Sequence, residues 1–342
     1  IRDAQESRGL GDVYKRQSPK GEPRILVYTY TEKVRQALFK GGNNMTLCYV
    51  CPHRCGVDRP ANMSDTTGCF GSCGVGLAPI VARAGLHMWE EPVISGTQGS
   101  GTVFFSGCNL HCVFCQNYDI SCNGFGKEIT IERLKEIYHE LIAQGAHNIN
   151  LVTPTHFTEA VLQSLDEPLP VPVVYNTSGF ETQDTLRRLK GKVQIYLPDL
   201  KYSDDMAAIK YSNAPYYFRI ATEAIKEMYN QVGDYHIDDN GIMTKGVIIR
   251  HLIMPGMPDN TKRIIDWVAA NFKPGQVMFS LMHQYVPCGR AAEYPEINRK
   301  VTDEEYKELE SYLLQSTIED GFVQEGDAAC KDFIPCFDGT GV

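Results

Sequence analysis

The fold is decided by the stretch Gly107-Cys108-Asn109-Leu110-His111-Cys112-Val113-Phe114-Cys115-Gln116-Asn117, which carries three cysteines with the spacing C-x3-C-x2-C. The stretch follows Thr102-Val103-Phe104-Phe105, a β-branched and aromatic run that predicts a short buried strand. Ser106-Gly107 ends that run, so we expect the thiols on a loop at the C-terminal end of a strand. Parallel α/β folds build their sites at that end of the strands.

The spacing of the three cysteines points to iron–sulfur chemistry. A four-iron cluster is ordinarily held by four thiolates, whereas this loop supplies three, so one iron would lack a protein ligand. An iron with an open position can bind a substrate or cofactor directly, as an open catalytic zinc does. The alternatives are a zinc knuckle or buried thiols. Zinc sites usually pair their cysteines as C-x2-C, and His111 as a fourth ligand would crowd its neighbours.

The loop resembles the signature of radical S-adenosylmethionine enzymes, in which an aromatic residue precedes the third cysteine. The resemblance implies a 4Fe-4S cluster on Cys108, Cys112 and Cys115 and a S-adenosyl-L-methionine chelated to the open iron. Reductive cleavage of that cofactor would give a 5′-deoxyadenosyl radical that abstracts a hydrogen atom. The resemblance places Phe114 near the adenine and Asn117 close to the cofactor, and it implies an electron donor such as flavodoxin or ferredoxin.

Length, charge and cysteine content narrow the class of protein. The chain has 342 residues, enough for one barrel-type domain with an appendage. Its net charge of −9 and its lack of a long basic run make nucleic acid an unexpected partner. No apolar run reaches membrane-spanning length. Twelve cysteines without a recognisable signal peptide indicate metal or redox chemistry in a reducing compartment, so we expect a cytoplasmic protein.

A second group of cysteines precedes the central loop. After a predicted helix at 31–40 comes Cys48-Tyr-Val-Cys51-Pro-His-Arg-Cys55-Gly-Val, followed by Cys69 and Cys73, a pattern typical of a closed four-thiolate site. The segment resembles one that heads a branch of pyruvate formate-lyase activating enzyme homologues. That resemblance extends to Gln324 and implies a second metal site, zinc or iron–sulfur, with these ligands: Cys48, Cys51, Cys55 and Cys73. A structural staple without a role in chemistry is the equal alternative.

The remainder of the chain alternates between strand and helix patterns. Strands are predicted at 102–105, 149–152, 171–175, 193–197, 247–254 and 277–282, and helices at 130–144, 156–165, 182–189, 204–211, 222–231, 261–271 and 303–316. This rhythm predicts a parallel sheet with helices outside it. We therefore expect an α/β protein whose six units form a partial (β/α)6 TIM-like barrel with a small Cys-rich N-terminal metal module, which is also the fold that the resemblance implies.

Domain boundaries follow from these patterns. Residues 7–17 resemble a translated sequencing adapter, so we interpret 1–17 as a non-native, disordered scar. The N-terminal helix and Cys-rich module are expected at 18–95, the barrel at 96–320 and a tail at 321–342.

Polar residues follow the predicted strands, at the edge where parallel strands converge. Asp199 and Lys201 project to the same side of an extended chain, and the resemblance suggests that Lys201 pairs with the methionine carboxylate. The turn Asn176-Thr177-Ser178-Gly179 resembles a ribose-contacting D-T-N-G turn, from which Asn176 and Ser178 depart. We interpret His251 as a hydrogen-bonded core residue. The candidate cofactor-binding residues are Phe114, Asn117, Thr153, Asn176, Ser178, Asp199, Lys201, Arg250 and His283.

Three functions are consistent with these observations. The first is a radical enzyme whose substrate, by resemblance, is a backbone glycine of a partner glycyl radical enzyme. The second is radical modification of a peptide or small molecule, favoured by a capped rather than an open barrel mouth. The third is a non-catalytic iron–sulfur or zinc protein, which would coordinate its metals fully at both cysteine groups.

Overall fold

The computed structural model describes residues 47–65, 67–324 and 335–342, all within one unit, Leu47–Val342. The predicted helix at 31–40 and the segment 1–17 lie outside the described residues.

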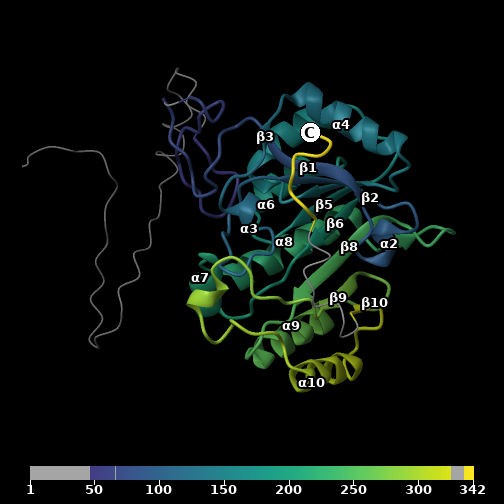
Figure 1. The fold of residues 1–342 in the computed structure, drawn as a ribbon. Coiled ribbons are helices and arrows are strands. Elements are labelled where there is room, and N and C mark those ends of the chain that lie inside the picture. The colour runs from purple at the N-terminus through teal and green to yellow at the C-terminus, as the bar shows by residue number, and fades with distance from the viewer. Residues whose placement is uncertain (1–46, 66, 325–334) are drawn as a thin grey trace, which may run out of the picture. The chain divides into compact units, whose positions relative to one another are not determined.

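A sheet of ten strands organises the described part of the chain (Figure 1). Along the sheet, β2, β4, β5, β6, β8 and β9 are parallel neighbours, which confirms the six-unit partial barrel. The strands are β1 (Ile80–His87), β2 (Ser100–Phe105), β3 (Lys127–Glu128), β4 (Ile149–Val152), β5 (Val173–Thr177), β6 (Ile195–Pro198), β7 (His236–Ile237), β8 (Met243–Leu252), β9 (Met278–Met282) and β10 (Gly321–Val323).

Helices follow the parallel strands and cover the outside of the sheet. Helix α4 shows why: Thr130 caps its N-terminus by accepting from the Arg133 amide, and Leu134, Ile137 and Leu141 form a buried stripe. The helices are α2 (Pro92–Ser95), α3 (Tyr118–Ser121), α4 (Ile131–Ala143), η1 (Thr155–Phe157), α5 (Thr158–Ser164), α6 (Gln183–Leu189), α7 (Asp205–Ser212), α8 (Tyr217–Val232), α9 (Pro258–Asn271), η2 (Ala291–Glu293) and α10 (Asp303–Leu314).

Most predicted elements begin within a few residues of their observed starts, and two of the shifts have a clear physical reason. Strand β5 starts at Val173 rather than 171, because Pro172 has no amide hydrogen to give to the ladder and instead its carbonyl accepts from Ile149. Helix α8 starts at Tyr217, five residues before the predicted 222, directly after Tyr216 in a left-handed conformation.

The sheet extends past both predicted boundaries of the barrel. Strand β1, inside the range assigned to the N-terminal module, pairs antiparallel with β2. Strand β10, inside the predicted tail, pairs parallel with β9. Residues 335–342 then pack along β1, where the Gly339 amide donates to the Ala82 carbonyl and the Ala84 amide donates to the Thr340 carbonyl. Figure 1 shows this terminal segment running beside β1.

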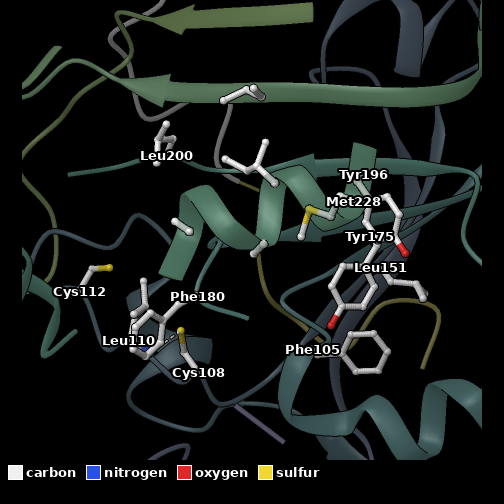
Figure 2. Close-up of a cluster of buried hydrophobic side chains, with 14 of the residues drawn as sticks. Phe105, Cys108, Leu110, Cys112, Leu151, Tyr175, Phe180, Tyr196, Leu200 and Met228 are labelled. Atoms are coloured by element: carbon white, nitrogen blue, oxygen red, sulfur yellow. Dashed lines mark hydrogen bonds between the residues drawn. The ribbon is translucent and has the colours of Figure 1, made fainter. Parts of the chain in front are cut away.

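Two apolar layers hold the barrel together. The short helix α2 places Val93 and Ile94 against interior side chains of β5, β6, β8 and β9, and so fills one end of the barrel. The larger layer lies between sheet and helices and includes Phe105, Tyr175 and Phe180. Figure 2 shows that this layer reaches the central loop, since Cys108 and Cys112 lie beside its side chains. The thiols therefore sit at the boundary between core and cleft.

Candidate active site

The central cysteine loop leaves β2 through Gly107, whose φ of 81° lies in the left-handed region. A Cβ at Gly107 would stand 2.8 Å from Val75 Cγ1 and 3.0 Å from the Cys73 carbonyl, so only glycine fits here. The loop is then tied to α7, because the Val113 amide donates to the Tyr211 carbonyl. The path of the loop is therefore set by the Cys-rich module on one side and by α7 on the other.

The three thiols of the loop open into one cleft of about 230 Å³ at the C-terminal ends of the strands. Burial raises the pKa of Cys108 to about 12 and also raises the pKa of Cys112 and Cys115, so binding a metal here must displace thiol protons. The Ser212 hydroxyl donates to Cys112 Sγ at 2.9 Å. The predicted ligands are thus brought together at the mouth of the barrel.

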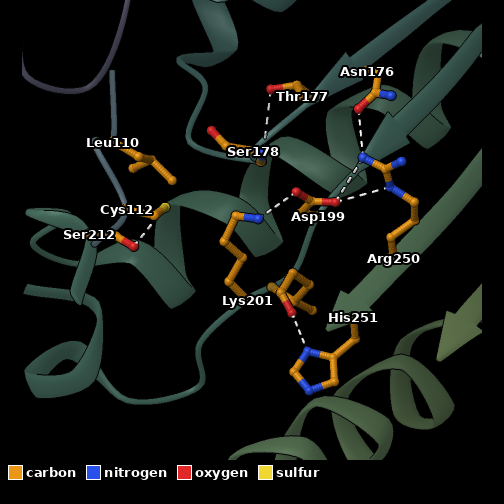
Figure 3. Close-up of polar contacts among 12 residues, drawn as sticks. Leu110, Cys112, Asn176, Thr177, Ser178, Asp199, Lys201, Ser212, Arg250 and His251 are labelled. Carbon is orange, nitrogen blue, oxygen red and sulfur yellow. Dashed lines mark hydrogen bonds and ion pairs between the residues drawn. The ribbon is translucent and has the colours of Figure 1, made fainter. Parts of the chain in front are cut away.

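A chain of alternating charges crosses the floor of the cleft (Figure 3). Lys201 Nζ lies 2.6 Å from Asp199 Oδ2, and Arg250 Nε donates to Asp199 Oδ1 at 3.0 Å. Arg250 Nη1 reaches Glu90 Oε2 at 3.2 Å, and its Nη2 donates to Asn176 Oδ1 at 2.6 Å. Burial disfavours the Asp199 carboxylate, but Lys201 and Arg250 outweigh it and lower its pKa. This arrangement leaves Lys201 at the end of the chain nearest the thiols, where it interacts electrostatically with Cys112.

Most predicted cofactor-binding residues line this cleft: Phe114, Asn117, Thr153, Asn176, Ser178, Asp199, Lys201 and Arg250. Ser178 Oγ is buried without a hydrogen-bond partner among the described residues. Thr153 has a φ of 58°, a strained value for a β-branched residue. Backbone strain and an unpartnered hydroxyl are both common where a protein holds a ligand.

His283 is not among the residues that line the cleft. Met282 and Gln284 both line it, so the intervening side chain points to the other face of the chain. His283 instead stacks on Tyr306 of α10, with 4.2 Å between ring centroids. His251 matches its prediction as a core residue, since its Nδ1 lies 2.7 Å from the Leu200 carbonyl and its Nε2 2.9 Å from Thr261 Oγ1.

Two glutamates, one lining the cleft and one supporting the strand ends beside it, were not singled out from the sequence. Glu90 follows β1, lines the cleft and accepts from Asn150 Nδ2 at 3.1 Å as well as from Arg250. Glu181 Oε1 accepts from Thr155 Oγ1 at 2.5 Å and from Thr177 Oγ1, so it joins the ends of β4 and β5. Their neighbours in the sequence give no signal of these roles, which became visible only once β1 and the β5–α6 turn were placed.

The Cys-rich module forms a tight hairpin at 47–58. The Cys48 amide donates to the Val57 carbonyl at 2.8 Å, and the Gly56 amide donates back to the Cys48 carbonyl at 3.0 Å. The thiols of Cys51 and Cys73 are buried and interact electrostatically with those of Cys48 and Cys55, while Cys69 is exposed. Burial raises the pKa of Cys51 to about 12. The four predicted ligands therefore lie close enough to interact, and Cys69 differs from them in being exposed.

The cysteine groups differ from a site for one bare ion. Within 47–65, 67–324 and 335–342, no three His, Cys, Asp or Glu side chains are arranged to hold a single metal ion. A four-iron cluster binds each thiolate at a different iron, so its ligands are spread more widely than those of a single ion.

Comparison with known proteins identifies the class of this fold and site. Residues 102–268 match the model of the radical SAM superfamily. The chain is 34% identical over 278 residues to the Methanocaldococcus jannaschii protein MJ0674, covering 78% of this chain and 73% of that protein. The chain belongs to the radical SAM superfamily, whose members carry out radical chemistry that depends on S-adenosylmethionine.

More distant similarities lie within the same superfamily. The chain is 24% identical over 246 residues to the ribosomal RNA large subunit methyltransferase Cfr of Staphylococcus aureus, which covers 66% of this chain and 65% of Cfr. SuiB of Streptococcus suis, solved with S-adenosylmethionine, is 12% identical with a TM-score of 0.44, over 64% of this chain and 48% of SuiB. A domain of a pyruvate-formate lyase-activating enzyme from Bacteroides vulgatus is 13% identical with a TM-score of 0.33, over 57% of this chain and 91% of that domain. The chain thus spans about half of SuiB and just under two thirds of Cfr.

One property of the helices bears on location. In the part of the chain that the structure describes, every helix is too short or too polar to cross a bilayer.

Proposed function

We propose that this protein is an enzyme that cleaves S-adenosylmethionine reductively and uses the resulting 5′-deoxyadenosyl radical to abstract hydrogen from a substrate. The observation that carries the proposal is that three thiols, and among the described residues no other cysteine, line a cleft that also contains Lys201 and Asp199. A cluster held there with one open iron would supply the electron for cleavage. Cys108, Cys112 and Cys115 are its proposed ligands.

The polar groups of the cleft fit the cofactor's functional groups. Lys201 Nζ, held by Asp199, is placed to pair with a carboxylate near the thiols. The unpartnered Ser178 hydroxyl and the Asn176 amide lie where a ribose could be hydrogen-bonded. The Phe114 ring, whose centroid lies 5.8 Å from that of the Tyr285 ring, offers an aromatic surface for the adenine. We propose that these residues orient the sulfonium toward the open iron.

The Cys-rich module would hold a second metal. Four grouped thiols, two of them buried, form the donor set of a closed site. A Cβ at Gly71 would stand 3.1 Å from Cys55 Sγ, so the backbone at Gly71 closes directly over that thiol. A second iron–sulfur cluster would bind each thiolate at a different iron, whereas zinc would require the thiols to move closer together, because no three of them are arranged for a single ion among the described residues. The iron, sulfide and zinc content of the anaerobically purified protein distinguishes the two.

The proposed substrate is a C–H bond of a partner protein, with a glycine of a glycyl radical enzyme as the first candidate and flavodoxin or ferredoxin as electron donor. A net charge of −9 is unfavourable for binding a phosphate backbone, so we do not extend to this chain the RNA substrate named for Cfr. A second candidate is a peptide or small molecule, and Pro335, which brings the C-terminal segment into the cleft wall, is the observation that favours it.

The deciding experiment is electron paramagnetic resonance of the anaerobically reconstituted and reduced protein, with and without S-adenosylmethionine. We expect the cofactor to change the signal of the reduced cluster, and we expect 5′-deoxyadenosine as a product. Cys112→Ala should lose the responsive signal while the protein stays folded. A cluster whose spectrum ignores the cofactor would support the non-catalytic carrier instead.

A further inference from the structure

The Cys-rich module touches the central cysteine loop next to its first ligand. His53 Nε2 donates to the Asn109 carbonyl at 2.6 Å, and Asn109 directly follows Cys108. Asn109 is fully buried, and its side chain is held as well, since its Nδ2 donates to the Phe180 carbonyl at 2.9 Å. The His53 ring packs edge-on against Phe180, with 5.3 Å between ring centroids. The residue after the first ligand is therefore held by two hydrogen bonds, whose partners His53 and Phe180 also pack against each other.

A second contact holds the residue before the next ligand. His111 Nε2 donates to the Ser72 carbonyl at 2.6 Å, and His111 directly precedes Cys112. His111 has a φ of 54°, a left-handed conformation that a non-glycine residue adopts only when its surroundings impose it. The bond to the module is a contact able to impose it. The loop is thus bent into an unfavourable shape at the point where it must present a thiol.

Each contact begins at a residue close to a module thiol. His53 lies two residues after Cys51, and Ser72 directly precedes Cys73. These two thiols are the buried members of the four. A metal bound to these two thiols would fix the backbone at His53 and Ser72. Because both residues hydrogen-bond to the central loop, fixing them would also restrict the conformation of that loop.

We propose that the Cys-rich module is a clamp that holds the central loop in its cluster-binding shape, with His53 and His111 as its positioning residues. Three ligands from one short loop bind a cluster well only if the loop is already in the right shape, because ordering it on binding would cost affinity. The clamp supplies that order. The inference rests on the proposed function only in taking the thiols of the central loop as cluster ligands.

The test compares variants that remove or keep each hydrogen bond. His53→Ala removes the donor, whereas His53→Gln keeps an amide N–H able to reach the same carbonyl. His111→Asn tolerates the left-handed backbone but is too short to reach Ser72. It also gives up the contact of His111 with Cys122, so Cys122→Ala, which removes that contact but keeps the bond to Ser72, is its control and should leave the rate unchanged. His139→Ala, on the exposed face of α4, is the matched control.

The readout is the rate at which an iron chelator bleaches the cluster absorbance of the reconstituted protein. If two clusters are present, their absorbance is lost in two kinetic phases. The phase that is absent from the Cys112→Ala variant is assigned to the cluster on the central loop. We expect this phase to be about fivefold to tenfold faster in His53→Ala and in His111→Asn, as the loss of one hydrogen bond to a backbone carbonyl predicts. His53→Gln and His139→Ala should stay within about twofold of the unaltered protein, and the thermal unfolding temperature monitors the fold.

Unchanged bleaching in both His53→Ala and His111→Asn would overturn the clamp. If His53→Ala fails to fold, the clamp is tested by the bleaching rate of His111→Asn compared with that of His53→Gln. Failure of the proposed function looks different: the reduced signal of the unaltered protein would ignore S-adenosylmethionine, while the chelation rates would still report on the clamp.

Discussion

Glu181 makes a prediction about how stability depends on pH. Its side chain is 2% exposed, and Oε1 accepts two hydrogen bonds from Thr155 and Thr177, while Oε2 has no partner among the described residues. Burial raises the pKa of Glu181 from 4.5 to about 7, although the two threonines lower it. Between these values the folded protein holds a proton that the unfolded chain releases.

The sign and size of the effect follow by linkage. Because the folded pKa is raised, the stabilisation is fully present below about pH 4.5 and is lost as the pH rises through about 7. A shift of this size corresponds to about 3 kcal/mol, of which most is lost between pH 5 and 8. Glu181→Gln keeps the acceptor oxygen but cannot titrate, so its unfolding free energy lacks this component.

The assay is anaerobic urea unfolding of both proteins between pH 5 and 8. We expect the unfolding free energy of the unaltered protein, minus that of Glu181→Gln, to fall by about 2 to 3 kcal/mol across this range. Other titrating groups cancel in the difference. Glu132→Gln, at an exposed position on α4, should give a constant difference. A constant or rising difference for Glu181→Gln would refute the reasoning.

Three further variants test other parts of the site. Arg250→Met leaves the buried Glu90 carboxylate without its cation, so urea unfolding should show a loss of about 3 to 5 kcal/mol; a loss below about 1 kcal/mol would contradict the charge chain. Ser212→Ala removes the hydrogen bond to Cys112, which should lower the midpoint potential of a cluster bound there in a redox titration followed by paramagnetic resonance; an unchanged potential speaks against that bond. His283→Phe keeps the stacking surface, so the affinity for S-adenosylmethionine in equilibrium dialysis should stay within about twofold; a loss of tenfold or more would restore His283 to the cofactor site.

Local patterns were enough to predict the parallel part of the fold. Strand β4 was predicted at its observed residues, and α4 within one residue at each end, because β-branched runs and 3.6-residue periodicity are encoded in neighbouring positions. The alternation rule also placed Asp199 and Lys201 on one side, and they form an ion pair at 2.6 Å. The same rule, applied to Met282 and Gln284, would have turned His283 away from the cleft.

Long-range contacts were not predictable in this way. Strand β1 is antiparallel within a parallel pattern, and the terminal segment that pairs with it lies more than 250 residues away along the chain. Glu90 enters the site only because β1 delivers it to Arg250, 160 positions later. Nothing in the neighbourhood of either residue signals that partner, so the sequence alone could not assign Glu90.

The placement of Glu90 explains a departure noted in the sequence. The third strand ends in Asn176 where the D-T-N-G turn that it resembles has an aspartate. In the structure Asn176 Oδ1 accepts from Arg250 at 2.6 Å, while its Nδ2 donates to Glu90 Oε1 at 3.3 Å. An aspartate could not make the second bond and would bring a like charge against Glu90. The carboxylate beside Arg250 is supplied by Glu90, and a neutral amide at 176 satisfies both neighbours.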